Sequence, residues 1–213
     1  MKVVSTNISK PKRVFWRVLP VKTGIFKEPI SGPIELGEHD VKGDAVVDRK
    51  HHGGLNQACY LYSADHYAFW KELYPDKELP FGMFGENLTV DGLDESNLHI
   101  GDIFQLGECK IQITQPREPC FKLGIRFNDQ GVLKKMISSG YCGTYVRILG
   151  TGKVVVGDQL ELLESQRDGL TITEVFNMIY AKSITQELRQ KLLSDTFLPD
   201  KLKVKLVSRH GAN

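Results

Sequence analysis

One cysteine of the sequence lies in a setting that suits reactive chemistry. It is Cys120, in the run Gln115-Pro116-Arg117-Glu118-Pro119-Cys120-Phe121-Lys122-Leu123. The prolines stiffen the backbone that leads to the thiol, and the cations on either side favour the thiolate. A thiolate is both a nucleophile and a soft metal ligand, and a helical turn opening at Cys120 would stabilise it further. A buried structural cysteine is the alternative, because free cysteines are usually buried.

A second candidate site is a glycine pair that follows a histidine, in Asp48-Arg49-Lys50-His51-His52-Gly53-Gly54. Glycine lets the backbone approach a ligand closely, and adjacent amide groups can form an anion-binding nest. This interpretation makes His52, Gly53 and Gly54 an anion site. A simple turn with two solvated histidines is the alternative, since turns are the commonest use of glycine pairs.

A third candidate lies in Phe84-Gly85-Glu86-Asn87-Leu88-Thr89. Here Glu86 offers a carboxylate and Asn87 an amide at the entrance of an expected strand. A β-turn that leads into the strand explains the same residues without any ligand.

The other cysteines give no metal pattern. Cys59, Cys109 and Cys142 lie far from Cys120 and from one another, and no C-x-x-C pair occurs. This spacing argues against a structural zinc site and against a ferredoxin-type cluster. Cys142 is either a resolving thiol for Cys120 or a core residue. The sequence also lacks the glycine-rich nucleotide loops, H-E-x-x-H and G-x-S-x-G.

Charge and composition exclude some classes of partner. The 213 residues carry 28 basic and 26 acidic side chains without a basic stripe, so nucleic acid is not an expected partner. The first ten residues lack the apolar core of a signal peptide, and no run approaches the roughly 18 apolar residues of a membrane span. We therefore expect a cytoplasmic protein that makes no membrane contact. The oligomeric state is not indicated.

The first part of the chain, residues 1–165, is predicted to be mainly β. Short β-rich runs alternate with Gly, Pro, Asn and Asp, and the Gly-Asp turns at 101–102 and 157–158 each lead into a strand with alternating apolar residues. This pattern favours a barrel-like sheet. The expected strands are 2–8, 57–62, 87–90, 103–106, 110–115, 144–149 and 159–163.

Helices are expected at a few places in this part and throughout the tail. Ser63 is a candidate cap for a helix that stops before Pro75, and residues 130–139 have an apolar helical face. The tail, residues 166–213, is predicted to be a three-helix unit. Its first two helices have capping-box patterns at Thr171 and Ser183, and its third covers 199–208. Because so short a unit is marginal alone, we expect it to pack on the sheet or on a partner.

Together and in this order, these segments resemble the MOSC family, named after the C-terminal domain of molybdenum cofactor sulfurase. They are most similar to its stand-alone bacterial branch, the 6-N-hydroxylaminopurine-resistance proteins. The similarity covers essentially the whole chain, including the helical tail. The matching segments are Gly43-Asp44, His52-Gly53-Gly54, Tyr60-Leu61-Tyr62, Phe84 to Thr89, Gly92-Leu93, Ile100-Gly101-Asp102, Gln115 to Leu123 and Cys142-Gly143.

The resemblance implies a β-barrel and a sulfur-carrying or metal-ligating role for Cys120, with His52, Glu86, Asn87 and Arg117 in the pocket. It implies molybdenum cofactor (molybdopterin), whose phosphate would be held by His52, Gly53, Gly54, Arg117 and Lys122 through charge-assisted hydrogen bonds. The pyridoxal-phosphate domain of a sulfurase is missing, so sulfur extraction from cysteine is not expected.

Three functions are compatible with these residues. The leading hypothesis is a molybdenum-dependent oxidoreductase component that reduces small N-hydroxylated substrates, with Cys120 as metal ligand and Glu86 or His52 as proton donor. Its electrons would come from a separate reductase. The second is a non-catalytic carrier of molybdenum cofactor, or of sulfur as a Cys120 persulfide. The third is a metal-free thiol enzyme that pairs Cys120 with Cys142.

Overall fold

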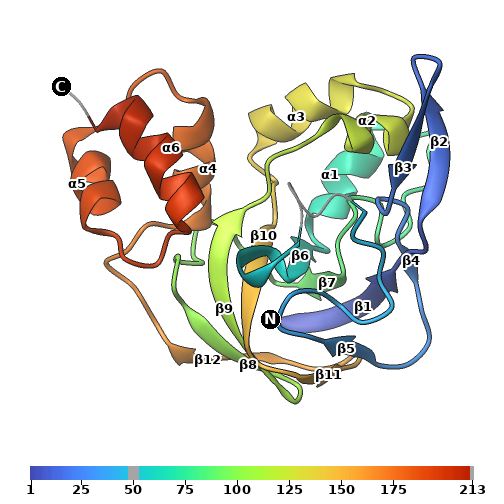
Figure 1. The fold of residues 1–213 in the computed structure, drawn as a ribbon, viewed down its shortest axis with the longest axis horizontal. Helices are drawn as coiled ribbons and strands as arrows, with labels where there is room; N and C mark the ends of the chain where they lie inside the picture. Colours follow the sequence, from blue (N-terminus) through green and yellow to red (C-terminus); the bar gives the residue numbers. More distant parts are fainter. Residues whose placement is uncertain (48–52, 212–213) are drawn as a thin grey trace.

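The chain is built around one curved sheet (Figure 1). The computed structural model describes residues 1–47 and 53–211. Eight strands pair in the order β12-β8-β9-β10-β6-β7-β1-β4. Neighbours are antiparallel except β6 and β7, which are parallel. The strands are β1 (Lys2–Ile8), β4 (Glu28–Pro29), β6 (Cys59–Ser63), β7 (Leu88–Asp91), β8 (Ile103–Leu106), β9 (Cys109–Pro116), β10 (Thr144–Gly150) and β12 (Leu160–Glu164).

The sheet curls without closing into the predicted barrel. Its ends meet where the amide of Val3 donates to the carbonyl of Asp158 at 2.8 Å and that of Leu160 donates to Met1 at 3.0 Å. Only one bridge pair, Lys2 with Gln159, forms there. The reason is that β1 pairs with β4 at its far end, so only the beginning of β1 is free to meet the segment before β12. The prediction of a closed barrel is therefore corrected to a mixed, open sheet.

Two small antiparallel pairs were not predicted. The first is the hairpin of β2 (Lys12–Trp16) and β3 (Leu19–Thr23), which projects from the body of the molecule at the upper right of Figure 1. Its turn residues Arg17 and Val18 have φ angles of 46° and 63°. Positive φ at both central positions is the requirement of a tight hairpin turn, usually met by Asn or Gly, and this chain meets it without either. The second pairs β5 (Ile34–Leu36) with β11 (Gly152–Val154).

Three helices lie together on one side of the sheet: α1 (His66–Leu73), α2 (Phe121–Phe127) and α3 (Gly131–Ser139). With the sheet they enclose an aromatic cluster that includes Trp70, Phe84 and Phe127. The predicted cap of α1 is wrong. Ser63 is extended and pairs with Val90 of β7, so the helix begins three residues later.

The tail forms the predicted three helices, α4 (Ile172–Tyr180), α5 (Gln186–Ser194) and α6 (Asp200–His210). The capping box of α4 is present: the Thr171 hydroxyl accepts from the Glu174 amide at 3.1 Å, and the Glu174 carboxylate accepts from the Thr171 amide at 2.8 Å. The cap of α5 is Thr185, whose hydroxyl accepts from the Leu188 amide at 3.2 Å. The prediction of Ser183 placed this cap two residues too early.

The tail packs on the sheet, one of the two arrangements expected. Leu202 and Leu206 of α6 and Phe176 of α4 belong to the same buried apolar cluster as Ile111 and Ile113 of β9. Sheet and tail therefore share one core, which supplies the burial that a unit of this size lacks alone. Across 1–47 and 53–211, each helix is too short or too polar to cross a membrane.

Candidate functional site

An inner cavity of about 80 Å³ lies beside the end of β9. It is lined by residues that are distant in sequence, from the end of β3 to β10. The described residues that line it include three cationic side chains, one carboxylate, two amides and one thiol: Lys27, Arg117, Lys122, Asp44, Gln57, Asn87 and Cys120. Three cations against one carboxylate make this an anion-accepting cavity.

Cys120 lies between β9 and α2, as predicted, and directly precedes the helix. Its backbone is extended, with φ −126° and ψ 161°, and its side chain makes no capping hydrogen bond to α2. It is partly buried, whereas the other three cysteines are buried, and all four thiols are free. Cys120 is therefore the thiol with access to a ligand.

Arg117 is the most deeply buried cation of the cavity, with 3% of its surface exposed. Its Nη1 donates to the carbonyl of Phe84, and its guanidinium lies 4.7 Å from the centre of the Tyr60 ring. Burial opposes its charge, but Tyr145, Tyr60 and Cys120 outweigh that effect and raise its pKa. Its Nε is buried and has no hydrogen-bond partner among the described residues. A buried donor without a partner is costly, so Arg117 is suited to a ligand that accepts from it.

Gly85 makes room for this arginine. Its φ angle is 79°, and a Cβ there would lie 3.3 Å from Arg117 Nη1 and 2.8 Å from Ile25 Cδ1. Both the backbone conformation and the close approach require glycine, which explains its place in the Phe84–Thr89 motif.

Lys27 and Asp44, which also line the cavity, form a buried ion pair. Asn87 joins them, because its Nδ2 donates to Asp44 Oδ2 at 3.0 Å. Asn87 therefore lies in the pocket, as the resemblance implies. Burial lowers the pKa of Lys27, although Asp44 acts in the other direction.

Glu86 does not face this cavity. Its carboxylate is fully buried and accepts from the amides of Gly82 and Phe84 at 2.7 and 3.1 Å. It also accepts from the hydroxyl groups of Thr89 and Tyr67. Burial raises the pKa of Glu86, while the Tyr67 hydrogen bond opposes the shift. Glu86 therefore positions the 82–89 segment. It does not line the cavity, where a proton donor was predicted.

The histidine–glycine segment is only partly described. His52, predicted as a catalytic and cofactor-binding residue, lies outside the described residues. Gly53 lines the inner cavity. The amide of Gly54 donates to the carbonyl of His39 at 3.0 Å, so it is not available for the anion that the sequence assigns to it.

A larger outer hollow of about 530 Å³ begins at Cys120. It shares four residues with the inner cavity: Gln57, Cys120, Lys122 and Tyr145. Its other wall comes from α6 of the tail, through Lys201, Leu202 and Lys205. The Cys120 thiol therefore lies where the two spaces meet.

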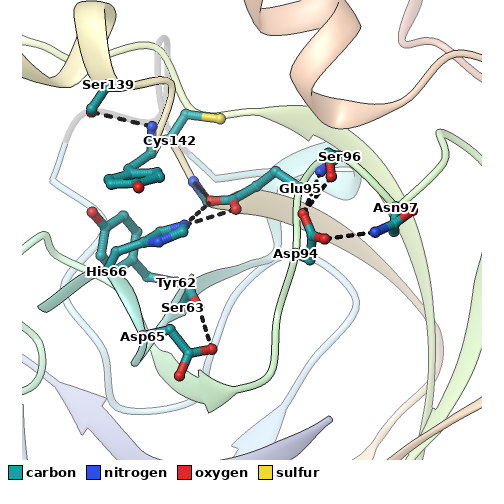
Figure 2. A network of polar contacts seen from close by, with 12 residues as sticks. Tyr62, Ser63, Asp65, His66, Asp94, Glu95, Ser96, Asn97, Ser139 and Cys142 are labelled. Atoms are coloured by element: carbon teal, nitrogen blue, oxygen red, sulfur yellow. Dashed lines mark hydrogen bonds and ion pairs between the residues drawn. The ribbon is translucent and has the colours of Figure 1, made fainter. Parts of the chain in front are cut away.

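Cys142 lies in a different environment, which Figure 2 shows. His66 Nε2 is 2.8 Å from Glu95 Oε2, and Glu95 Oε1 accepts from the amide of Gly143 at 2.9 Å. The His66 ring also stacks on Tyr141 with centroids 3.8 Å apart. Burial and the nearby Glu95 raise the pKa of Cys142, and neither hollow is lined by it. These observations favour a core role for Cys142.

Four site residues were missed by sequence reasoning: Lys27, Asp44, Gln57 and Tyr145. Asp44 was in a motif that had been noticed, but without an assigned role. Lys27 and Tyr145 carry no local signal, because only the fold brings the loop after β3 and the strand β10 to Cys120.

Comparisons with known proteins agree with this architecture. The model of the family described as MOSC domain matches residues 48–161. An uncharacterized protein YflK of Bacillus subtilis is 36% identical over 198 residues, covering 93% of this chain and 89% of the relative. Protein YiiM of Escherichia coli is 34% identical over 174 residues, covering 81% and 77%. A protein of Gibberella moniliformis named a reductase is 34% identical over 84% of this chain, which spans 33% of that relative.

Solved structures show the same fold along the chain. The crystal structure of YiiM from Geobacillus stearothermophilus has a TM-score of 0.81 at 29% identity and covers 98% of both chains. That of YiiM from Escherichia coli has a TM-score of 0.74 at 27% identity, covering 98% of this chain and 92% of that one. The family match and these relatives together show that the chain belongs to the MOSC domain family.

Proposed function

We propose that this protein binds molybdenum cofactor at Cys120 and reduces small N-hydroxylated substrates, with electrons from a separate reductase. The observation that carries the proposal is the position of the Cys120 thiol, at the junction of a cation-lined inner cavity and an outer hollow open to a substrate. The fungal relative named a reductase supports an oxidoreductase role.

The residues around Cys120 fit the cofactor in two respects. A thiolate is a soft ligand of the kind that binds transition metals, and Cys120 is the partly buried thiol of the site. An anionic pterin phosphate needs cations and donors, and Lys27, Arg117 and Lys122 line the cavity. The partnerless Nε of Arg117 is the donor that this phosphate would satisfy.

When bound, the cofactor supplies the two-electron redox chemistry of molybdenum, and the chain supplies position and protons. Reduction of an N-hydroxyl group to N–H with release of water consumes two electrons and two protons. Lys27 lines the cavity and burial lowers its pKa, which suits it to hold and release one of these protons. We assign this role to Lys27 in place of Glu86. The roles predicted for His52 stay predictions.

The decisive experiment is metal and pterin analysis of protein purified gently from a host that makes molybdenum cofactor. We expect stoichiometric molybdenum and pterin, and reduction of 6-N-hydroxylaminopurine when a reductase is supplied. Cys120→Ser should lose molybdenum and activity while it keeps the circular dichroism of the parent. Cys109→Ala changes a thiol that lines neither hollow and should keep both.

Two results would contradict the proposal. Protein that contains neither molybdenum nor pterin, from a host that loads other molybdoenzymes, would remove the basis for a molybdenum enzyme. The sulfur carrier would instead be favoured by two results together. Mass spectrometry of protein purified without reductant would find an added sulfur atom on Cys120, and the protein would show no catalytic turnover.

A further inference from the structure

Helix α6 of the tail forms one wall of the outer hollow at Cys120. Lys201, Leu202 and Lys205 of α6 line it together with Glu118, Pro119 and Cys120. The volume, about 530 Å³, lies within the range of about 300–1,000 Å³ usual for small-molecule sites. The tail thus takes part directly in the space from which a substrate reaches the thiol.

The charge of this hollow is positive, and its free positive charge comes from α6. Among the described residues, three lysines, Lys122, Lys201 and Lys205, and one carboxylate, that of Glu118, line it. Lys205 Nζ donates to both Glu118 oxygens at 2.8 Å, so these two charges largely cancel. Lys201 is exposed and has no ion pair with any described residue. A ligand in the hollow therefore meets an uncompensated ammonium group on α6.

The hollow is also lined by apolar and aromatic side chains. They are Pro119 and Phe121 next to Cys120 in the sequence, Tyr145 of β10 and Leu202 of α6. Trp16 of the β2–β3 hairpin supports Phe121, with ring centroids 6.4 Å apart. Aromatic and proline surfaces of this kind accept a planar ring by stacking. The hollow thus offers aromatic and apolar surfaces that suit a base and an ammonium group that suits an anion.

We propose that this hollow is a nucleotide subsite, in which α6 selects N-hydroxylated nucleoside monophosphates over the corresponding nucleosides and free bases. The base lies against Phe121 and Tyr145 with its N-hydroxyl group toward Cys120, and the 5′-phosphate is bound by Lys201. This inference rests on the proposed function, whose substrate class it narrows. It also gives the helical tail a role in substrate recognition.

The test is direct binding by calorimetry at low ionic strength, which does not depend on turnover. The ligands are 6-N-hydroxylaminopurine riboside and its 5′-monophosphate. The wild-type protein should bind the monophosphate more tightly, by a factor of up to about five, as expected for one added charge contact at an exposed lysine. Lys201→Gln should abolish most of this ratio and leave riboside affinity unchanged. Lys182→Gln removes an equally exposed lysine of the tail that lines no part of the hollow, and should keep the ratio.

Glu118→Gln provides a test in the opposite direction. It releases Lys205 from its carboxylate partner, so monophosphate affinity should rise while riboside affinity stays the same. Added salt should reduce the monophosphate preference in every variant that shows one, because exposed charges are screened.

Three outcomes would overturn the inference. They are equal affinity for riboside and monophosphate, a Lys201→Gln effect of the same size on both ligands, and failure of both to bind. A loss of pterin from Lys201→Gln would also overturn it, by showing that α6 holds the cofactor instead. The three binding results are measured separately from the molybdenum and pterin content of the wild-type protein, which decides the proposed function.

Discussion

The ammonium group of Lys27 lies against the carboxylate of Asp44 in the wall of the inner cavity, with 8% and 3% of the two side chains exposed. Asp44 is fixed from behind, because the amide and hydroxyl of Ser9 donate to its Oδ1 at 2.8 and 3.2 Å. A buried charge is tolerated when it is paired and hydrogen-bonded. The ion pair therefore fixes the ammonium group of Lys27 at the cavity, whereas the ammonium group of an exposed lysine would be mobile.

Removal of Asp44 alone should lower the free energy of unfolding much more than removal of both charges of the Lys27–Asp44 pair. Asp44→Ala leaves the Lys27 charge buried and unpaired, and should lower the free energy of unfolding by about 3–5 kcal/mol. The double variant Lys27→Met/Asp44→Ala should recover a large part of this loss, because no buried charge remains. Urea unfolding of the single and double variants measures the coupling. If the loss of stability in the double variant equals the sum of the losses in the single variants, the two charges do not stabilise each other.

The buried carboxylate of Glu86 should make stability depend on pH. Its pKa is raised by burial in the folded state, so the folded protein binds the proton more tightly than the unfolded chain does. The resulting stabilisation is complete below the unfolded pKa, about 4.3, and is lost as pH rises through the folded pKa. The loss is about 1.4 kcal/mol for each unit of the shift.

The measurement is the free energy of unfolding of the wild type minus that of Glu86→Gln, from pH 4.5 to 8. Glutamine does not titrate, so this difference should fall as pH rises and then become flat. A difference that rises with pH would mean that the hydrogen bonds from Gly82, Phe84 and Thr89 outweigh the effect of burial.

Local pattern was enough to predict the main strands and the helical tail. β1 and β8 have the predicted bounds, and the Thr171 capping box is formed as its spacing requires. The β2–β3 hairpin escaped prediction because Arg17 and Val18 adopt positive φ, a conformation that their residue types rarely take. The closed barrel was wrong for a non-local reason, since pairing of β1 with β4 is not visible in either segment alone.

The candidate site divides in the same way. Cys120, Arg117, Lys122 and Asn87 were predicted from short motifs, and they line one cavity. The partner of Asn87 there is Asp44, held by Lys27 from another loop, and no spacing rule links these three residues. Glu86 came from the same motif as Asn87 but does not line the cavity, because a carboxylate near a strand entrance can serve its own turn as well as a ligand.

His66 should stabilise the segment that carries Cys142. It pairs with Glu95, which holds the Gly143 amide, and stacks on Tyr141. His66→Ala removes the pair and the stacking, and should cost about 2 kcal/mol. The thiol of Cys142 should then react faster with a thiol reagent in the folded protein, since local opening becomes easier. His39→Ala is the control, and no change in Cys142 reactivity would show that the network does not shield the thiol.

Attachment of the tail to the sheet should depend far more on the apolar packing of α6 than on the ion pair between Lys205 and Glu118. Leu206 is fully buried in the shared core, so Leu206→Ala should cost about 3 kcal/mol. Lys205→Gln breaks a pair whose side chains are 47% and 44% exposed, and should cost less than about 1 kcal/mol. Val204→Ala, at a position 68% exposed, is the control.

Calorimetry should show one transition in every variant, with the melting temperature lower by about 2–4 °C for each kcal/mol lost. Two transitions, with only the first moved by Leu206→Ala, would mean that the tail and the sheet unfold separately, despite their common core.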